Sequence, residues 1–206
     1  MKILWLGIIL MATLSFRSSA ADDGGKVLAA TIEKLRQAPS LVIDFEMVQD
    51  SHRLTGTMEA VGDCFAIKTR DGAYETWFDG KTQWTWLESS DEVNITEPSA
   101  QELMETNPLF VIDSSAKNYN VSLKGETGSE NILMLTPKNT KLTNVANAEL
   151  NISKSTNFPV SLKVTLKDRQ VIVFVFNRVT TGKKLSTQDF RYNDARHPNA
   201  QIIDLR

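Results

Sequence analysis

Apolar and polar residues alternate along much of this chain with a period of two, which is typical of β-strands that bury one face. The clearest example is the segment 158–167, whose apolar positions are Phe158, Val160, Leu162, Val164 and Leu166. Residues 41–48 show the same pattern, with one strongly apolar face and one partly polar face. Each of these strands therefore needs an apolar cover on one side only.

Further strand-like segments are separated by short turns. They are 54–61, 64–69, 93–96, 119–124, 131–136, 146–152 and 171–176. Together with a C-terminal stretch whose Ile202, Ile203 and Leu205 close an edge, they predict about nine to eleven strands. Short connections favour antiparallel pairing. We predict a mainly β (α+β) fold: an incomplete, strongly curved antiparallel β-barrel, or half-barrel, with helices covering its concave apolar face.

A hairpin rich in tryptophan is predicted at residues 74–87. Its Asp79-Gly80 pair favours the positive φ angles of a tight turn between two segments rich in aromatic and β-branched residues. Trp77, Trp84 and Trp86 all belong to this hairpin, and Trp84 and Trp86 share a face. So much aromatic surface needs either a packed core or an apolar ligand opposite it.

An amphipathic helix is predicted at residues 26–38, after a polar and flexible lead at 22–25. Its apolar stripe consists of Leu28, Ile32 and Leu35. Pro39 ends it, because the residue before a proline disfavours helical backbone.

Two short helices are predicted in the middle of the chain. Ser99 and Glu102 have the spacing of a capping box, and Asn107-Pro108 supplies a cap and a first-turn proline for a second helix. That second segment continues as residues 109–112, which are apolar almost all round, so it must be covered on several sides or form a lid. We expect the N-terminal helix and residues 99–112 to lie on the concave side of the sheet.

The first twenty residues have the three parts of an export signal. Lys2 is the basic start, residues 3–14 are apolar, and residues 18–20 are small. The apolar part is too short to span a bilayer well. We therefore expect a signal peptide at 1–20, cleaved after Ala20 or, almost equally, after Ala21, followed by one domain at 21–206. No cysteine follows either cleavage site, so a lipid anchor at the new N-terminus is not expected.

The composition limits the possible functions. The formal net charge is −2, and it becomes more negative when Lys2 and Arg17 are removed with the signal peptide. A mildly acidic domain argues against non-specific binding of nucleic acid. Cys64 is the only cysteine, so it cannot form an internal disulfide and is expected to be a small buried hydrophobe.

The sequence has few groups that suit catalysis. His52 and His197 are its only histidines, and neither lies in a recognisable pattern with a serine or cysteine. Metal-binding, nucleophile and phosphate-loop motifs do not occur. Asp44 and Glu46 share a strand face, which a solvated surface explains more simply than a catalytic pair. We therefore expect neither an enzyme nor a bound cofactor or metal.

Large apolar side chains are more numerous than catalytic groups. They either fill a packed core, which the alternation alone favours, or line a pocket, which walls rich in methionine and aromatic residues suit. If there is a pocket, the residues expected to form its walls and lid are Ile43, Phe45, Met47, Met58, Phe65, Trp84, Trp86, Leu103, Phe110, Leu162 and Val164.

Several motifs, taken in order, carry a resemblance to a known family. They follow the N-terminal helix as residues 42–47, 79–84, 107–110 and 133–138. In this order they resemble the periplasmic outer-membrane lipoprotein carrier proteins (LolA-like), and the similarity extends from about Lys26 to Phe190. One departure is that residues 60–64 lack the Arg-Pro pair that many members carry just before the strand corresponding to the one with Phe65.

The resemblance implies a half-barrel whose apolar cavity receives the acyl chains of lipoproteins. It implies a periplasmic, non-catalytic carrier that takes acylated lipoproteins from an inner-membrane transporter to an outer-membrane acceptor. We expect a monomer. The missing arginine helps to hold the lid closed in the family, so the lid mechanism and the cargo stay open. The alternative is a binding module of the same fold that senses lipid or lipoprotein without transporting it.

Overall fold

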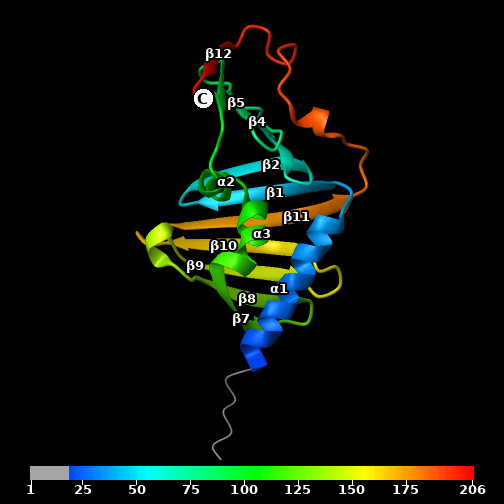
Figure 1. Cartoon of the computed structure of the whole chain (residues 1–206), viewed down its shortest axis with the longest axis vertical. Helices are drawn as coiled ribbons and strands as arrows, with labels where there is room; N and C mark the ends of the chain where they lie inside the picture. Colours follow the sequence, from blue (N-terminus) through cyan, green and yellow to red (C-terminus); the bar gives the residue numbers. More distant parts are fainter. Residues whose placement is uncertain (1–18) are drawn as a thin grey trace, which may run out of the picture.

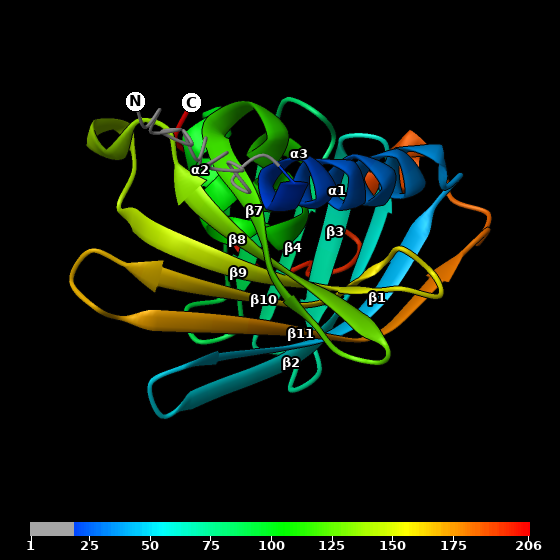
Figure 2. The ribbon, with the colours of Figure 1, turned by 90° about the horizontal axis from the view of Figure 1, so that it is seen from below.

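A computed structural model describes residues 19–206 of the chain, so most of the expected signal peptide lies outside the described residues. In the described part, twelve strands form one sheet that curls around three helices (Figures 1 and 2). The strand order is β12-β6-β5-β4-β3-β2-β1-β11-β10-β9-β8-β7. This is the incomplete, curved β-barrel that the sequence predicted, because β7 and β12 end the sheet without pairing with each other.

The strands of the first half are β1 Leu41–Gln49, β2 His52–Val61, β3 Cys64–Thr69, β4 Tyr74–Phe78, β5 Gln83–Leu87 and β6 Glu92–Thr96. Those of the second half are β7 Tyr119–Glu126, β8 Glu130–Pro137, β9 Val145–Ser153, β10 Pro159–Leu166, β11 Val171–Thr181 and β12 Gln201–Asp204. Neighbouring strands are antiparallel except β12 and β6, which are parallel. The predicted C-terminal edge strand is thereby confirmed.

Three α-helices cover the concave face of the sheet, as predicted (Figure 2). They are α1 Ser19–Gln37, α2 Ala100–Thr106 and α3 Pro108–Asn118; two short 3₁₀ helices, η1 Thr140–Leu142 and η2 Thr187–Phe190, lie in connections. Leu28 of α1 and Ile112 of α3 are buried in one cluster with Ile43 and Leu162 of the sheet. The two apolar faces therefore form a single core.

The caps of the two central helices agree with the sequence. The Ser99 hydroxyl accepts a hydrogen bond from the N–H of Glu102, and the Glu102 carboxylate accepts one from the N–H of Ser99 at 2.7 Å. The Asn107 side chain accepts a hydrogen bond from the N–H of Leu109 at 2.9 Å, with Pro108 in the first turn. Each cap satisfies donors that have no partner within the helix.

Helix α1 is longer than predicted, because the stretch expected to be a flexible lead is already helical. Gly24 explains this difference: a Cβ atom there would lie 2.6 Å from the backbone nitrogen of Leu123 in β7. The glycine therefore lets the start of α1 pack directly on an edge strand. Tertiary contact overrides the low helix propensity of glycine at this point.

The tryptophan hairpin pairs as predicted, with Trp77 opposite Trp84. The prediction of its turn was wrong, because only Gly80 has a positive φ angle, of 95°. The loop is longer, and the N–H of Asp79 donates to the carbonyl of Thr82. The Asp79 carboxylate accepts hydrogen bonds from the N–H groups of Lys81 and Thr82, at 3.1 and 2.9 Å. The aspartate thus shapes the turn through its side chain.

The predicted alternation in 158–167 is interrupted at its start. The pairing of β10 with β9 shifts between Pro159 and Ser161, so that Pro159 is buried opposite Ile152 and Val160 falls at the irregularity. From Leu162 onward the predicted inward face is confirmed, since Leu162 and Val164 are buried.

Gly56 of β2 provides a test of the packing on the inner face. A Cβ atom there would lie 2.5 Å from the carbonyl oxygen of Lys68 and 3.0 Å from the ring of Phe45. We expect Gly56→Ala to lower the free energy of unfolding by about 1–3 kcal/mol, because crowding a packed site forces its neighbours to move. Urea unfolding measures this loss. Gly125→Ala is the control, since no atom lies within 4 Å of its added methyl group; equal losses in both variants would contradict the packing.

Candidate binding cavities

Two apolar cavities lie under the helical cover, on either side of α3. The first, here called the α1–α3 cavity, has a volume of about 300 Å³. The second, here called the η1 cavity, has a volume of about 280 Å³. Both volumes lie at the lower end of the range for small-molecule sites.

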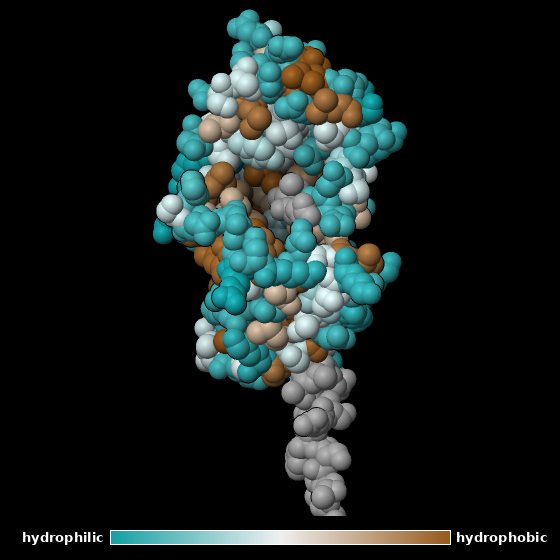
Figure 3. All heavy atoms as spheres, turned by 90° about the vertical axis from the view of Figure 1, so that its left-hand side faces the viewer, coloured by the Kyte–Doolittle hydropathy of each residue, from teal (hydrophilic) through white to brown (hydrophobic). Residues whose placement is uncertain are grey.

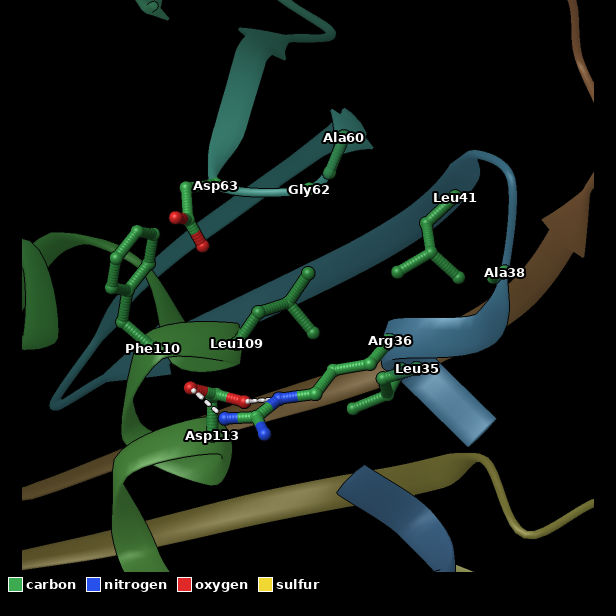
Figure 4. Close-up of a pocket in the computed structure, with 10 residues that line it drawn as sticks. All are labelled: Leu35, Arg36, Ala38, Leu41, Ala60, Gly62, Asp63, Leu109, Phe110 and Asp113. Carbon is green, nitrogen blue, oxygen red and sulfur yellow. Dashed lines mark hydrogen bonds and ion pairs between the residues drawn. The ribbon is translucent and has the colours of Figure 1, made fainter. Parts of the chain in front are cut away.

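The α1–α3 cavity is lined by Leu35, Arg36, Ala38, Leu41, Ala60, Gly62, Asp63, Leu109, Phe110 and Asp113 (Figure 4). Its apolar walls come from the end of α1, the first strands and the start of α3. The Phe110 ring lies with its centroid 5.9 Å from that of Phe65 and 6.3 Å from that of Phe78, in edge-on geometry. Phe110 therefore connects the helical cover to the aromatic residues of the sheet.

An ion pair stands at the rim of the α1–α3 cavity. The Arg36 guanidinium donates two hydrogen bonds to the Asp113 carboxylate, at 2.7 and 3.0 Å, and so ties α1 to α3 (Figure 4). The hydrogen bond to Asp113, together with the charge of that carboxylate, raises the pKa of Arg36. The Arg36 side chain is 67% exposed. An ion pair so open to water contributes little to stability. Breaking this contact between α1 and α3 therefore costs little free energy.

The η1 cavity lies between the helices and the other half of the sheet. Its lining residues are Gln101, Met104, Val111, Tyr119, Leu142, Thr143, Asn144, Val145, Ala148, Val164, Leu166, Ile172 and Phe174. Burial raises the pKa of the Tyr119 phenol, against the effect of its hydrogen bond with Thr143, so this side chain stays neutral. Figure 3 looks onto the side of the molecule where α2 and η1 lie, and it shows a hollow with hydrophobic residues at its bottom.

The structure distributes the expected pocket residues over three places. Phe110 lines the α1–α3 cavity and Val164 lines the η1 cavity. The core between the cavities contains Ile43, Phe45, Met58, Phe65, Leu103 and Leu162, all buried, with Met47 half-buried at its edge. The interior is thus a packed core in the middle with open space at two ends.

Trp84 and Trp86 do not lie with the other nine residues. Cross-strand partners share a face, and Trp84 pairs with Trp77 while Phe78, the next residue along, pairs with Phe65 of the core. The tryptophans therefore occupy the outer face of the sheet. The expectation that they line the inner cavity is corrected by this register, because an even and an odd position of one strand point to opposite sides.

The C-terminal segment covers Trp77 and Trp86 on the outer face. The His197 ring stacks on Trp86, with centroids 3.8 Å apart and planes inclined by 11°. Tyr192 lies 5.4 Å from Trp77, between ring centroids, and the Arg196 guanidinium lies 5.2 Å from the Trp77 ring. Trp77 and Trp86 are thereby packed against side chains of the same chain.

Most of the residues that line the cavities were not singled out by sequence reasoning. Leu35 belongs to the predicted helical stripe, and Leu166 to the predicted inward face of its strand, so both carried a signal. Ile172 and Phe174 belong to a strand that is apolar on both faces, where alternation cannot identify the inner side. Only the structure shows that these two residues line the η1 cavity, together with Leu142 of η1.

The candidate carboxylate pair on β1 is divided between two partners. Asp44 accepts hydrogen bonds from Thr57 and from Arg178, and these lower its pKa. Glu46 instead forms an ion pair with Arg53 at 2.9 Å. Within residues 19–206, no cluster of three or more His, Cys, Asp or Glu side chains is arranged to hold a metal ion. In the same range, no helix has the length and apolar character needed to cross a membrane.

Comparison with solved structures finds the same fold in distant proteins. An uncharacterised conserved protein from Thermus thermophilus superposes with a TM-score of 0.61 at 14% identity, over 88% of this chain and 99% of that one. A putative outer membrane lipoprotein-sorting protein domain from Vibrio parahaemolyticus gives 0.51 at 11% identity, over 83% and 97%. MucB gives 0.50 at 18% identity, over 84% of this chain and 63% of MucB. Identities this low establish the fold alone.

The comparison with curated proteins finds no match. The family model of the outer membrane lipoprotein carrier protein LolA, in contrast, matches residues 14–170, which is well over half of the chain. This match covers the N-terminal helix, the tryptophan hairpin, α3 and the strands through β10. With its half-barrel and the apolar cavities beneath its helices, the chain belongs to the outer membrane lipoprotein carrier protein (LolA) family.

Proposed function

We propose that this protein is a periplasmic carrier that shields the acyl chains of lipoproteins and takes them from the inner to the outer membrane. The observation that supports the proposal most directly is the pair of apolar cavities beneath a helical cover held by an exposed ion pair. Family membership and the expected export signal agree with it. The donor would be an inner-membrane transporter and the acceptor an outer-membrane protein, with the carrier acting as a monomer.

The physical task of such a carrier is to replace water around a hydrocarbon chain. Each methylene removed from water contributes about 0.8 kcal/mol, so an acyl chain of typical length gains roughly 10 kcal/mol from complete burial. The two cavities are small for that purpose. Uptake of a whole chain therefore requires α3 to move away from α1 or from the sheet.

The same geometry supports a second candidate, a module that senses lipid or lipoprotein without transporting it. Transfer distinguishes the two. A carrier loaded with a fluorescent acylated peptide should deliver it to acceptor vesicles faster than the peptide crosses water alone. Binding without faster delivery would favour the sensor.

The cavity assignment predicts that Phe110→Ser weakens the binding of a fluorescent fatty acid by about tenfold, because a large apolar wall is lost. Trp86→Ser is the matched control: it removes an aromatic residue of the outer face and should leave the affinity within about twofold. Fluorescence titration measures both affinities, and urea midpoints show that the variants fold. If Trp86→Ser weakened binding as much as Phe110→Ser in folded proteins, the inner cavities would not be the site.

The rim ion pair predicts a kinetic effect. We expect Asp113→Asn to accelerate fatty-acid uptake by about twofold to fivefold with little change in stability, because an exposed pair contributes at most a small free energy. Stopped-flow fluorescence measures the uptake rate. Glu46→Gln is the control, since it removes the carboxylate partner of Arg53, an arginine on the outer face that is 67% exposed, as Arg36 is. An uptake rate unchanged by Asp113→Asn would show that α1 and α3 do not gate the cavity.

A further inference from the structure

Leu142 is the most exposed of the large hydrophobic side chains in the described part of the chain, at 71%. An exposed leucine is by itself ordinary. This one, however, belongs to the short helix η1 and stands at the mouth of the η1 cavity. An apolar side chain in water thus lies beside an apolar cavity that opens next to it.

Basic residues surround this mouth. The group, here called the basic rim, consists of Lys117, Lys138, Lys141, Lys167 and Arg169, all exposed. Lys138 donates through its Nζ to the carbonyls of Ala116 and Lys117 at the end of α3, at 3.3 and 2.9 Å.

The turn between β10 and β11 brings the rest of the basic rim to the same place. Lys167 donates through its Nζ to the carbonyl of Thr140 and through its N–H to the carbonyl of Asn144. The N–H of Arg169 bonds to the carbonyl of Leu166, which itself lines the cavity.

The basic rim differs from the rest of the surface in its charge balance. Elsewhere in residues 19–206, eleven of the sixteen lysine and arginine side chains form ion pairs with carboxylates. None of the five basic residues at the η1 mouth does so within the same range. Lys138 and Lys167 donate hydrogen bonds to backbone carbonyls, which carry no net charge and so do not neutralise them. Asp168, between Lys167 and Arg169 in the turn, offsets one of these five positive charges. A protein with a net charge of −2 therefore still concentrates net positive charge at one cavity mouth.

We propose that the basic rim and Leu142 form a docking surface for an anionic lipid bilayer. Lysines near a membrane surface gain electrostatic energy from anionic head groups, and an apolar side chain among them can enter the acyl boundary. In this orientation the η1 cavity opens onto the bilayer, so an acyl chain passes between the two without crossing water. The docking surface stands on its own, whereas the passage of a chain rests on the proposed function.

The choice of a bilayer over an acidic protein follows from the chemistry of the mouth. Four of the five charges are lysines, which are flexible point charges and suit a fluid array of head groups better than a fixed carboxylate geometry. An acidic peptide would give the exposed leucine and the open apolar cavity no apolar partner, whereas the interior of a membrane supplies one.

The test uses the processed protein, without its expected signal peptide, and vesicles of phosphatidylcholine with or without phosphatidylglycerol. We expect co-sedimentation with the anionic vesicles, weakened by salt, and far less with the neutral ones. The triple variant Lys117→Gln/Lys141→Gln/Arg169→Gln should bind anionic vesicles about a hundredfold more weakly, since each charge contributes about fivefold. These three side chains form no hydrogen bond or ion pair in the described structure, so folding should be unaffected.

Two matched controls accompany these variants. Arg70→Gln/Lys163→Gln/Lys184→Gln removes three other exposed cations that form no ion pair with a described carboxylate, and it should retain most of the binding. Leu142→Ser should weaken binding by about tenfold, whereas Leu205→Ser, at a side chain that is 62% exposed, should change it little.

The outcomes separate this inference from the proposed function. If the protein binds a fatty acid in solution but does not sediment with anionic vesicles, the docking surface is overturned and the carrier survives. If it sediments but binds no fatty acid, docking stands and the carrier fails. Equal losses in the two triple variants, or equal binding to neutral vesicles, would overturn docking through the basic rim.

Discussion

The pairing of β1 with β11 is the interaction on which the rest of the structure depends. It joins a meander of strands from the first half of the chain to another from the second half, and so makes one sheet from the two. A register shift between Asp44 and Phe45 interrupts this pairing, and such irregularities bend a sheet. On the outer face the same two strands are joined by the ion pair of Asp44 with Arg178, at 2.8 Å. Without this long-range contact, neither half would have a concave face to cover.

A concave apolar face creates more space than three short helices can fill. Helices α1 and α3 press their apolar side chains into the middle of the face, where Ile112, Leu133 and Leu162 are fully buried. The space that remains lies at the two ends, beside Phe110 and beside Leu142. The middle of the interior therefore supplies the packing energy, and the open space lies at its two ends.

Local patterns predicted the fold well because each acts over a few residues. The boundaries of β3, β4 and β5 and the caps at Ser99 and Asn107 follow from alternation and side-chain chemistry. The faces of Trp84 and Trp86 were missed because the apolar side of β5 is its outer side: Gln83 and Thr85, which alternate with the tryptophans, lie on the inner face. The rule that the apolar side of a strand faces the core therefore selects the wrong side here. Their cover, residues 191–200, has no periodic pattern at all. The cavities depend on the positions of helices relative to the sheet, which arise from contacts such as that of Gly24 with β7.

The two cavity mouths differ in electrostatic character. At the α1–α3 mouth, Asp63 and Asp113 outnumber Arg36. At the η1 mouth, four lysines form no ion pair with a described carboxylate, and the elements α1 and η1, which line the two cavities, lie on opposite sides of α3 (Figure 1). An anionic surface therefore attracts one mouth and repels the other. Because the attraction involves only exposed charges, it is screened within about 10 Å at moderate salt. Such an attraction can turn a nearby molecule toward the surface without holding it there.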